Sequence, residues 1–403
     1  MGDFYQNGLV TTLHDFKHRD EQDLENELFE FSKDRPMALI IPSLYSELEG
    51  KALKGILDEL AKIPYLNEIV IGLDKANEQQ FQHAKKYFNR LPQHHRIIWN
   101  DGPRLKALHK LLKNEKIAPT QLGKGRNVWY CSGYLIASGK SEAIALHDAD
   151  ILTYNKSLLN RLFYPVVNPN FHYRFCKGYY FRADENTLKG RAVRLFFKPL
   201  IRTLMQFFGP TETLQYFDSF RYPFAGEFSM RSDVMRNIRI PCDWGLEIGI
   251  LSEVHRNQSF NRICQVEIAD RYDHKHQQVG ENDPGVGLNK MTYDIALDLY
   301  IKLAQDGIVF SADKFRSIRS SFLRIAFDFV ERYQNDAIMN GYSYDRHSEE
   351  KIVNLFSVNV FKAGKDFLKN PDHPIFIPNW KRVMSAIPDF LEKFYEAVEL
   401  DNK

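Results

Sequence analysis

Short apolar runs alternate with amphipathic stretches along the first 150 residues of the chain. The apolar runs are typical of strands buried on both faces of a parallel sheet, and they lie at 37–41, 68–72, 96–99 and 143–146. Between them, an apolar period of about 3.6 residues predicts helices at 50–63, 78–88, 106–112 and 125–138. This alternation predicts an α/β fold with a mostly parallel, doubly wound sheet.

The hydrophobic pattern changes twice after residue 150. From 155 to 285 it is mixed, and it predicts strands at 171–180 and 263–269 and a helix at 188–208. From 287 onward it is almost purely helical, with helices expected at 292–304, 312–333, 348–364 and 380–398. We therefore expect three parts. The first is a polar N-terminal segment (1–35) with a helix around 20–34, and the second is a main domain (36–285) with halves 36–150 and 151–285. The third is a C-terminal helical region (286–403) that packs on, or is exchanged between, protomers.

Composition narrows the class of protein. The 403 residues suffice for one large domain with an appendage, or for two domains, and a net charge of +2 gives no electrostatic basis for binding nucleic acid or membranes. The four cysteines are widely spaced and form neither a zinc motif nor a dense disulfide framework. The sequence shows no secretory signal and no apolar stretch of the ~20 residues that span a bilayer. We expect a cytoplasmic protein with no nucleic-acid partner and no membrane span.

Two carboxylates follow the fourth predicted strand, in the tetrad His147-Asp148-Ala149-Asp150. Residues i and i+2 of an extended chain point the same way, so both acids can face the crevice where open α/β sheets bind ligands. Two hard oxygen ligands there suit Mg²⁺ or Mn²⁺ carrying a diphosphate. The alternative is a plain turn that caps a helix. The position after a strand and the neighbouring motifs favour the metal site.

Two loops of the first half are candidates for binding a nucleotide. Pro42-Ser43-Leu44-Tyr45-Ser46-Glu47 ends the first strand, where backbone amides and a carboxylate can bind a base and ribose; the alternative is a β–α turn capped by a serine. In Gly123-Lys124-Gly125, the glycines allow a close backbone approach, and Lys124 can pair with a diphosphate at a helix start. The alternative there is a flexible loop with a solvated lysine.

A metal-bound diphosphate at the end of a strand is how a nucleotide-sugar glycosyltransferase holds its donor, so carboxylates of the second half are candidates for chemistry on the donor sugar. Glu227 follows small residues in Pro223–Phe228, which suggests a tight approach to a donor sugar; a turn with a surface acid is the alternative. Asp243 and Glu247 open a predicted helix. They can face the acceptor hydroxyl or the sugar ring, stabilise an oxocarbenium ion or act as a base. The alternative is that the helix dipole favours acids in a first turn.

Two further segments are rich in charge. Asp270–His276 follows a strand and is dense in metal-competent groups, so a histidine there is a candidate third metal ligand, and oxygen ligands make zinc less fitting. In Lys189–Arg202, amides of Gly190–Val193 at a helix start can bind an anionic acceptor, and Arg191 offers a bidentate fork. The alternative is an exposed helix face.

The order of these motifs resembles that of the retaining glucosyl-3-phosphoglycerate synthases of the GT-A fold. It resembles the mannosylglycerate and mannosyl-3-phosphoglycerate synthases more loosely. The likeness covers about residues 35–285, and the motifs that carry it are Pro42-Ser43-Leu44, Gly123-Lys124-Gly125, Asp148-Ala149-Asp150, Gly190–Val193, Ala225-Gly226-Glu227, Gly245–Gly249 and Asp273-His274.

This resemblance implies a Rossmann-like GT-A domain with a C-terminal helical extension. It also implies a metal-dependent enzyme that transfers glucose from a nucleotide sugar, with UDP-glucose favoured, to 3-phosphoglycerate. The product would be glucosyl-3-phosphoglycerate, a compatible-solute precursor. The resemblance also implies that the configuration at the anomeric carbon is retained by front-face attack. The departing diphosphate helps to deprotonate the acceptor, so no protein nucleophile is required. A homodimer is expected.

The resemblance also implies roles for single residues. Pro42, Ser43, Leu44 and Asp74 would border the uridine, Lys124 the diphosphate and Asp148 the ribose, while Asp150 and His274 would bind Mg²⁺ or Mn²⁺. Glu247 would hold sugar hydroxyls, and Gly190, Arg191 and Val193 the acceptor. The complete candidate set adds Glu47 and Ala149 on the donor side, Ala192 and His276 on the acceptor side, and Asp243 and Glu227 among the catalytic candidates.

The chain departs from the family pattern around the sugar and acceptor pockets. It has Ala225 where the family usually has glycine, Lys275-His276 where the family has Arg-Asn, and Val193 where a hydroxyl residue is common. A GDP-mannose donor, or a glycerate or glycerol acceptor, is therefore the nearest alternative.

Two other classes of function are less favoured. A nucleotidyltransferase predicts a loop rich in glycine and basic residues directly after the first strand, and residues 42–46 do not supply one. A degenerate, non-catalytic binding module predicts loss of a metal acid or of the diphosphate lysine. Asp148, Asp150, Lys124 and His274 are all present.

Overall fold

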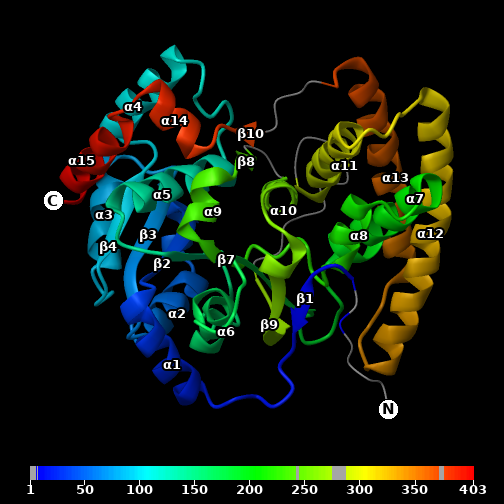
Figure 1. Ribbon diagram of the computed structural model, residues 1–403. Helices are drawn as coiled ribbons and strands as arrows, with labels where there is room; N and C mark the ends of the chain where they lie inside the picture. Colours follow the sequence, from blue (N-terminus) through cyan, green and yellow to red (C-terminus); the bar gives the residue numbers. More distant parts are fainter. Residues whose placement is uncertain (1–5, 7, 242–244, 275–286, 372–375) are drawn as a thin grey trace.

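An eight-stranded mixed sheet forms the centre of the molecule (Figure 1). The computed structural model describes residue 6 and residues 8–241, 245–274, 287–371 and 376–403. The strand order is β1-β9-β6-β7-β5-β2-β3-β4, and every neighbouring pair is parallel except those of β7, which runs antiparallel to β5 and β6. The strands are β1 Thr11–Leu13, β2 Met37–Leu44, β3 Leu66–Asp74, β4 His95–Trp99, β5 Ala143–Leu146, β6 Phe175–Arg182, β7 Phe228–Arg231 and β9 Ile263–Tyr272.

The predicted alternation of strands and helices in the first half is confirmed. The apolar runs form β2 to β5, and because successive side chains of a strand face opposite sides, each strand contributes to two cores. Leu39 and Ile41 face one core, whereas Ala38 and Ile40 face the other. The helices that cover the two faces are α1 Glu21–Asp34, α2 Lys51–Leu60, α3 Glu78–Phe88, α4 Pro103–Asn114, α5 Lys124–Ser138 and α6 Lys156–Val167.

The second half differs from the sequence prediction in detail. The predicted strand at 171–180 begins only at Phe175, and β7 was not predicted because it has just four residues. The helix predicted at 188–208 begins only after Gly190, whose φ of +74° is not helical. It consists of a π-helical segment, Ala192–Phe197, followed by α7, Lys198–Phe208. The remaining elements here are α8 Glu212–Ser219, α9 Ser232–Asn237, β8 Ile240–Pro241, α10 Leu246–Asn257 and the short helices Tyr45–Glu49 and Phe260–Arg262.

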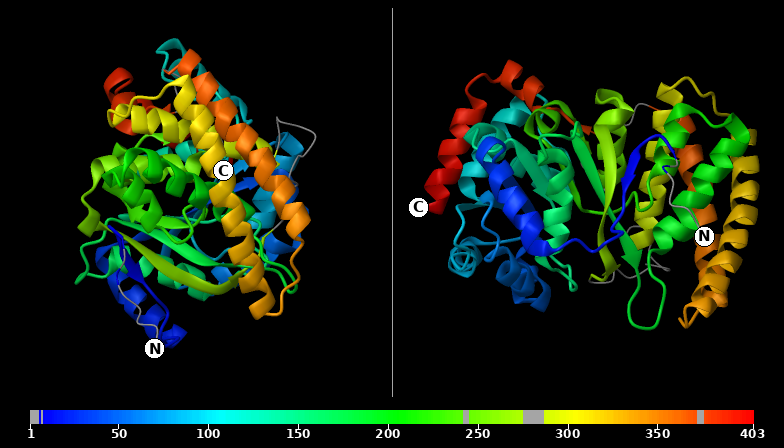
Figure 2. Two further views of the ribbon diagram at one scale, coloured as in Figure 1. Left: turned by 90° about the vertical axis from the view of Figure 1, so that its right-hand side faces the viewer. Right: turned by 60° about the horizontal axis from the view of Figure 1, so that its bottom comes forward.

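The C-terminal helices separate into two groups. Helices α11 Gly287–Gln305, α12 Ala312–Met339 and α13 Arg346–Lys369 pack together beside α7, along one side of the molecule in Figure 2. After β10, Phe376–Ile377, the chain returns to the first half, where α14 Trp380–Ala386 and α15 Phe390–Asn402 follow. The prediction of one helix over 380–398 is wrong, because Pro388 stands at the break and proline cannot donate the backbone bond of a helix interior.

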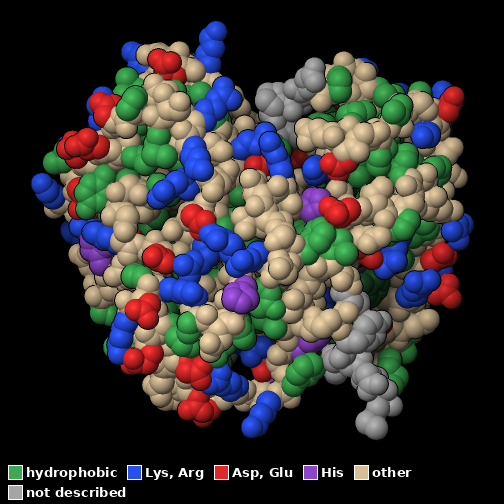
Figure 3. Space-filling model, in the orientation of Figure 1, with side chains coloured by type: hydrophobic (Ala, Val, Ile, Leu, Met, Phe, Trp, Pro, Cys, Tyr) green, Lys and Arg blue, Asp and Glu red, His purple; other side chains and the backbone are tan. Residues whose placement is uncertain are grey.

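Acidic and basic side chains are interspersed over the face of the molecule in Figure 3. Among the described residues, no helix is both long enough and apolar enough to cross a membrane.

Candidate active site

Two carboxylates and one imidazole converge at the carboxyl edge of the sheet. Asp148 and Asp150 follow β5, and His274 follows β9. One ligand atom of each residue lies within 4.8 Å of those of the other two. The two loops are joined by an antiparallel bridge between Ile151 and His274. The predicted convergence of these three side chains is therefore seen in the structure.

The electrostatics of this cluster fit a divalent cation. Burial, and next the negative charge of Asp148, raise the pKa of Asp150 to about 7. Burial also disfavours the ionised form of Asp148, but the ammonium group of Lys124 outweighs it and holds the pKa of Asp148 below its usual value. A divalent cation among the three groups would relieve the repulsion between the carboxylates. Hard carboxylate oxygens with one imidazole suit Mg²⁺ or Mn²⁺.

Lys124 connects the two halves of the site. It is the first residue of α5, and its Nζ lies 2.6 Å from Asp148 Oδ1 and 3.0 Å from Glu247 Oε1. Burial lowers the pKa of Lys124, but the two carboxylates outweigh burial and raise it. Glu247 lies in the first turn of α10. The lysine is thus a fixed cation directly beside the cluster.

The segment Ala225-Gly226-Glu227 packs beneath Asp148. A Cβ atom on Gly226 would lie only 2.6 Å from Asp148 Oδ2, so only glycine leaves this carboxylate in place. Glu227 is fully buried and accepts hydrogen bonds from the hydroxyls of Tyr180 and Tyr272. Burial, and next the charge of Asp148, raise its pKa. In this geometry Glu227 holds two tyrosines of β6 and β9.

Sequence reasoning missed Lys177, although it is the one charged residue in the apolar run 175–181 of β6. Its Nζ donates to the carbonyl oxygen of Ala225, and the residue is 1% exposed. Burial lowers the pKa of Lys177 to about 8, although Glu247 and Glu227 oppose the shift.

The predicted nucleotide residues lie at the ends of β2 and β3. Pro42, Ser43 and Leu44 are the last three residues of β2, and Leu44 pairs in register with Asp74. Arg126 Nη2 and Asn127 Nδ2 donate to the two oxygens of Asp74 at 2.8 Å and 2.9 Å. Sequence reasoning missed both donors, because only the packing of α5 on β3 brings them to Asp74. Glu47 lies in the short helix after β2, and Ala149 is buried.

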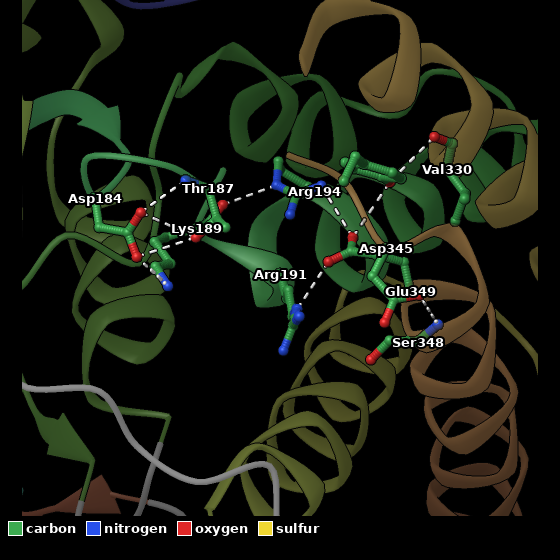
Figure 4. Close-up of polar contacts among 10 residues, drawn as sticks. Asp184, Thr187, Lys189, Arg191, Arg194, Val330, Asp345, Ser348 and Glu349 are labelled. Atoms are coloured by element: carbon green, nitrogen blue, oxygen red, sulfur yellow. Dashed lines mark hydrogen bonds and ion pairs between the residues drawn. The ribbon is translucent and has the colours of Figure 1, made fainter. Parts of the chain in front are cut away.

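The predicted acceptor loop contacts the C-terminal helices (Figure 4). Gly190 adopts a φ of +74°, a conformation that favours glycine, and Ala192 and Val193 are buried. Arg191 Nε donates to Glu349 Oε1 at 2.8 Å, and Arg194 Nη1 lies 3.2 Å from Glu349 Oε2. Sequence reasoning missed Glu349 of α13, since 158 residues separate it from Arg191. Asp243 and His276, also candidates, lie outside the described residues.

Comparison with known proteins extends over the whole chain. No known family model matches it. A glucosyl-3-phosphoglycerate synthase of Persephonella marina is 44% identical over 402 residues, which cover 100% of this chain and 99% of the relative. Another, from Methanococcoides burtonii, is 42% identical over 406 residues, which cover 100% of this chain and 98% of the relative.

Solved structures show the fold. Glucosyl-3-phosphoglycerate synthase of Mycobacterium tuberculosis, in complex with Mn²⁺, UDP-glucose and phosphoglyceric acid, matches with a TM-score of 0.53 and 18% identity over 75% of this chain and 89% of that one. Mannosyl-3-phosphoglycerate synthase of Rubrobacter xylanophilus matches with a TM-score of 0.55 and 19% identity over 74% and 83%. The expected GT-A fold is thereby confirmed. Full-length identity above 40% to two curated relatives shows more: the chain belongs to the glucosyl-3-phosphoglycerate synthase family of glycosyltransferases.

Proposed function

We propose that the protein transfers glucose from UDP-glucose to 3-phosphoglycerate with retention of configuration, giving glucosyl-3-phosphoglycerate. The observation that carries the proposal is the cluster of Asp148, Asp150, His274 and Lys124 in a chain that aligns along its full length with two synthases of that name. It supplies both a cation site and a cationic side chain at the position where a diphosphate would lie.

On the donor side, the end of β2 and Asp74 border the uridine, and Asp148 lies near the ribose. Asp150 and His274 hold Mg²⁺ or Mn²⁺, which stabilises the negative charge of the leaving diphosphate when it is bound. Because Asp74 already receives hydrogen bonds from Arg126 and Asn127, its position is fixed before the nucleotide arrives.

Lys124 and Glu247 act as a pair in this scheme. In the structure, Lys124 is neutralised by Asp148 and Glu247. A bound diphosphate competes for the ammonium group, which leaves Glu247 available to accept hydrogen bonds from sugar hydroxyls. The anionic acceptor lies at Gly190–Val193, where the backbone amides at the helix start and Arg191 attract it. The leaving diphosphate takes up the acceptor proton, so Glu247 serves to orient the sugar.

The test is a matrix of donors and acceptors with the purified protein and Mg²⁺ or Mn²⁺. UDP-glucose and GDP-mannose are each combined with 3-phosphoglycerate, glycerate and glycerol. We expect turnover chiefly with UDP-glucose and 3-phosphoglycerate, and an α-linked product by NMR. Turnover with GDP-mannose alone would contradict glucose as the transferred sugar and favour mannose. Mannose is the sugar in the name of the structural match from Rubrobacter xylanophilus.

Loss of one metal ligand tests the cation site. Asp150→Ala should reduce turnover at least about a hundredfold while the Tm without ligands changes little, because a buried carboxylate in a repulsive pair is removed. The shift in Tm that UDP causes only with Mn²⁺ should also vanish. Wild-type turnover with unchanged metal dependence would remove Asp150 from the site.

A homodimer and a cytoplasmic location stay predictions. Sedimentation velocity at several protein concentrations tests the first, and fractionation of the source cells tests the second.

A further inference from the structure

Arg182 lies beside the acceptor loop without a carboxylate partner in the described part of the chain. It is the last residue of β6, and its Nη1 donates to the hydroxyl of Tyr222 at 3.3 Å. Its Nε atom is buried and has no hydrogen-bond partner. Among the residues whose placement the structure describes, no Asp or Glu forms an ion pair with it.

Within the described residues, the two arginines that follow Gly190 are neutralised by a carboxylate, whereas Arg182 is not. Arg191 and Arg194 share Glu349. A guanidinium group keeps its charge at every physiological pH. Arg182 is half-buried, and a partly buried charge with neither an anion nor a full set of hydrogen bonds destabilises the protein. An anionic ligand would supply the missing partner.

The position of Arg182 identifies that ligand. Its carbonyl oxygen accepts a hydrogen bond from the amide of Lys189 at 3.0 Å, directly before Gly190. A Cβ atom built on Gly190 would lie 3.7 Å from Arg182 Cβ and 3.4 Å from Tyr222 Cε2. Arg182 and Tyr222 therefore form the floor under the loop to which the acceptor is assigned.

A row of packed aromatic rings connects this floor to the candidate cation site. The ring of Tyr222 lies 5.0 Å from that of Tyr180, which stacks on Tyr272 at 3.8 Å, and Tyr272 lies 5.7 Å from the ring of His274. An anion bound at Arg182 would thus lie at one end of a row of packed side chains whose other end is His274 of the candidate cation site.

We infer that Arg182 binds an anionic group of the acceptor, its phosphate or its carboxylate, and makes the site specific for anionic acceptors. The inference rests on the proposed function and adds a residue to it. Glu349 accepts a hydrogen bond from Nε of Arg191, which leaves the two terminal nitrogens of that guanidinium for the acceptor. No Asp or Glu in the described part of the chain pairs with Arg182, so an acceptor anion can neutralise it.

Arg182→Met tests this inference, because methionine keeps much of the side-chain volume and removes the charge. The KM for 3-phosphoglycerate should rise at least about tenfold, because the variant lacks a charge-assisted hydrogen bond to the acceptor. The KM for UDP-glucose should stay within about twofold of the wild-type value. Calorimetric titration of 3-phosphoglycerate, which needs no turnover, should show the same loss. A rise below about twofold in both measurements would overturn the inference.

Two shortened acceptors separate the possible anions. If Arg182 binds the phosphate, the variant loses activity with glycerol 3-phosphate and not with glycerate. If it binds the carboxylate, the reverse holds. If wild type and variant have equal kcat/KM values with glycerol 3-phosphate and with glycerate, Arg182 binds neither the phosphate nor the carboxylate, and the inference is contradicted.

Arg221→Met is the matched control. Arg221 is exposed, neighbours Tyr222 in sequence and lies over Tyr179 instead of under the loop, so acceptor KM should not change. If Arg182→Met does not fold, Arg182→Lys replaces it. A point charge without the planar fork should raise the acceptor KM by an intermediate factor, and an unchanged KM would overturn the inference. Failure of the wild type to use 3-phosphoglycerate would contradict the proposed function alone, since anion binding to wild type and variant can still be compared.

Discussion

Asp148 is fixed by neighbours that all belong to the candidate site. Lys124 approaches one of its oxygens to 2.6 Å, and Gly226 leaves room for the other. Asp150 shares the buried cluster, so any movement of Asp148 changes the separation between the two carboxylates. At the scale of residues, the position of the metal-binding pair depends on a glycine that itself carries no functional group.

Gly226→Ala should therefore damage the site more than the fold. The added methyl would force the Asp148 carboxylate to shift. We therefore expect kcat/KM to fall at least about tenfold and metal-dependent UDP binding to weaken. The free energy of unfolding should fall by roughly 1–3 kcal/mol. Steady-state kinetics and urea unfolding measure both. Gly55→Ala is the control, because a Cβ there meets nothing within 4 Å; an equal loss of activity in the control would contradict the explanation.

Lys177 should make stability depend on pH. Burial lowers its pKa in the folded protein from 10.5 to about 8, so the protonated form destabilises the fold. This cost is complete below pH 8 and disappears as pH rises toward 10.5. Between about pH 7.5 and 9.5, the free energy of unfolding of wild type should rise by roughly 2 kcal/mol relative to Lys177→Met. Urea unfolding at both pH values measures the difference, and parallel pH profiles of the two proteins would refute it.

The sequence predicted the site only where the signal is local. Asp148 and Asp150 follow an apolar run directly, and His274 follows another, so acids and a histidine at strand ends predicted the cluster. Glu349 and Arg182 acquire their importance from partners 158 and 40 residues away, and no pattern in one sequence records such contacts. Lys177 did give a signal, a single charge within an apolar strand, which sequence reasoning did not use.

At the scale of elements, α15 covers the edge of the sheet. β4 is an edge strand, and the side chain of Asn402 bonds to it as a neighbouring strand would. Ile97 N donates to Asn402 Oδ1 at 2.9 Å, and Asn402 Nδ2 donates to Ile97 O at 2.9 Å. Unpaired strand edges promote association between chains, so this contact serves solubility as well as stability.

Asn402→Ala should expose that edge. We expect a loss of about 1–2 kcal/mol in the free energy of unfolding from two hydrogen bonds, together with faster aggregation on mild heating. Urea unfolding and light scattering measure the two effects. Glu396→Ala, on an exposed position of the same helix, should change neither. A variant as stable and as soluble as wild type would show that the side chain does not protect β4.

Long and fully buried helices and strands were predictable from the hydrophobic pattern of the sequence, whereas short ones were not. β2 to β5 lie between covering helices and have continuous apolar runs, whereas β1 and β7 have three and four residues and gave no clear period. Pro388 marks the break between α14 and α15. The helical period of apolar residues continues across this proline, which is why the pattern predicts one helix.

At the scale of the whole molecule, the chain closes back on its first half. Trp380 of α14 is fully buried, stacks on Trp129 of α5 at 4.0 Å and donates to Ser132 Oγ at 3.0 Å. A Cβ atom on Gly133 would lie 2.2 Å from the Trp380 ring, so α5 has a glycine where the ring packs. The division of the chain at residues 35, 150 and 285 stays a prediction, and α14 and α15 pack on the first half from beyond the last of these boundaries.

Trp380→Ala should destabilise the first half of the main domain. Removing a fully buried tryptophan leaves a cavity that costs about 3–5 kcal/mol, and we expect UDP to stabilise the variant less than wild type. Urea unfolding with and without UDP and Mn²⁺ measures both quantities. Trp380→Phe keeps an aromatic ring against Trp129 and should lose less than half as much. Equal stability of wild type and Trp380→Ala would contradict the role of this contact.

The return of α14 and α15 to the first half has a consequence for biosynthesis. Residues 37–146 leave the ribosome early, but the partner ring for Trp129 and the cover for β4 come from residues 380–402. While translation proceeds, the nascent first half has an open strand edge and an incomplete core. We therefore expect the core around Trp129 and the edge at β4 to be completed only after residues 380–402 emerge, and an exposed strand edge favours association between chains until then.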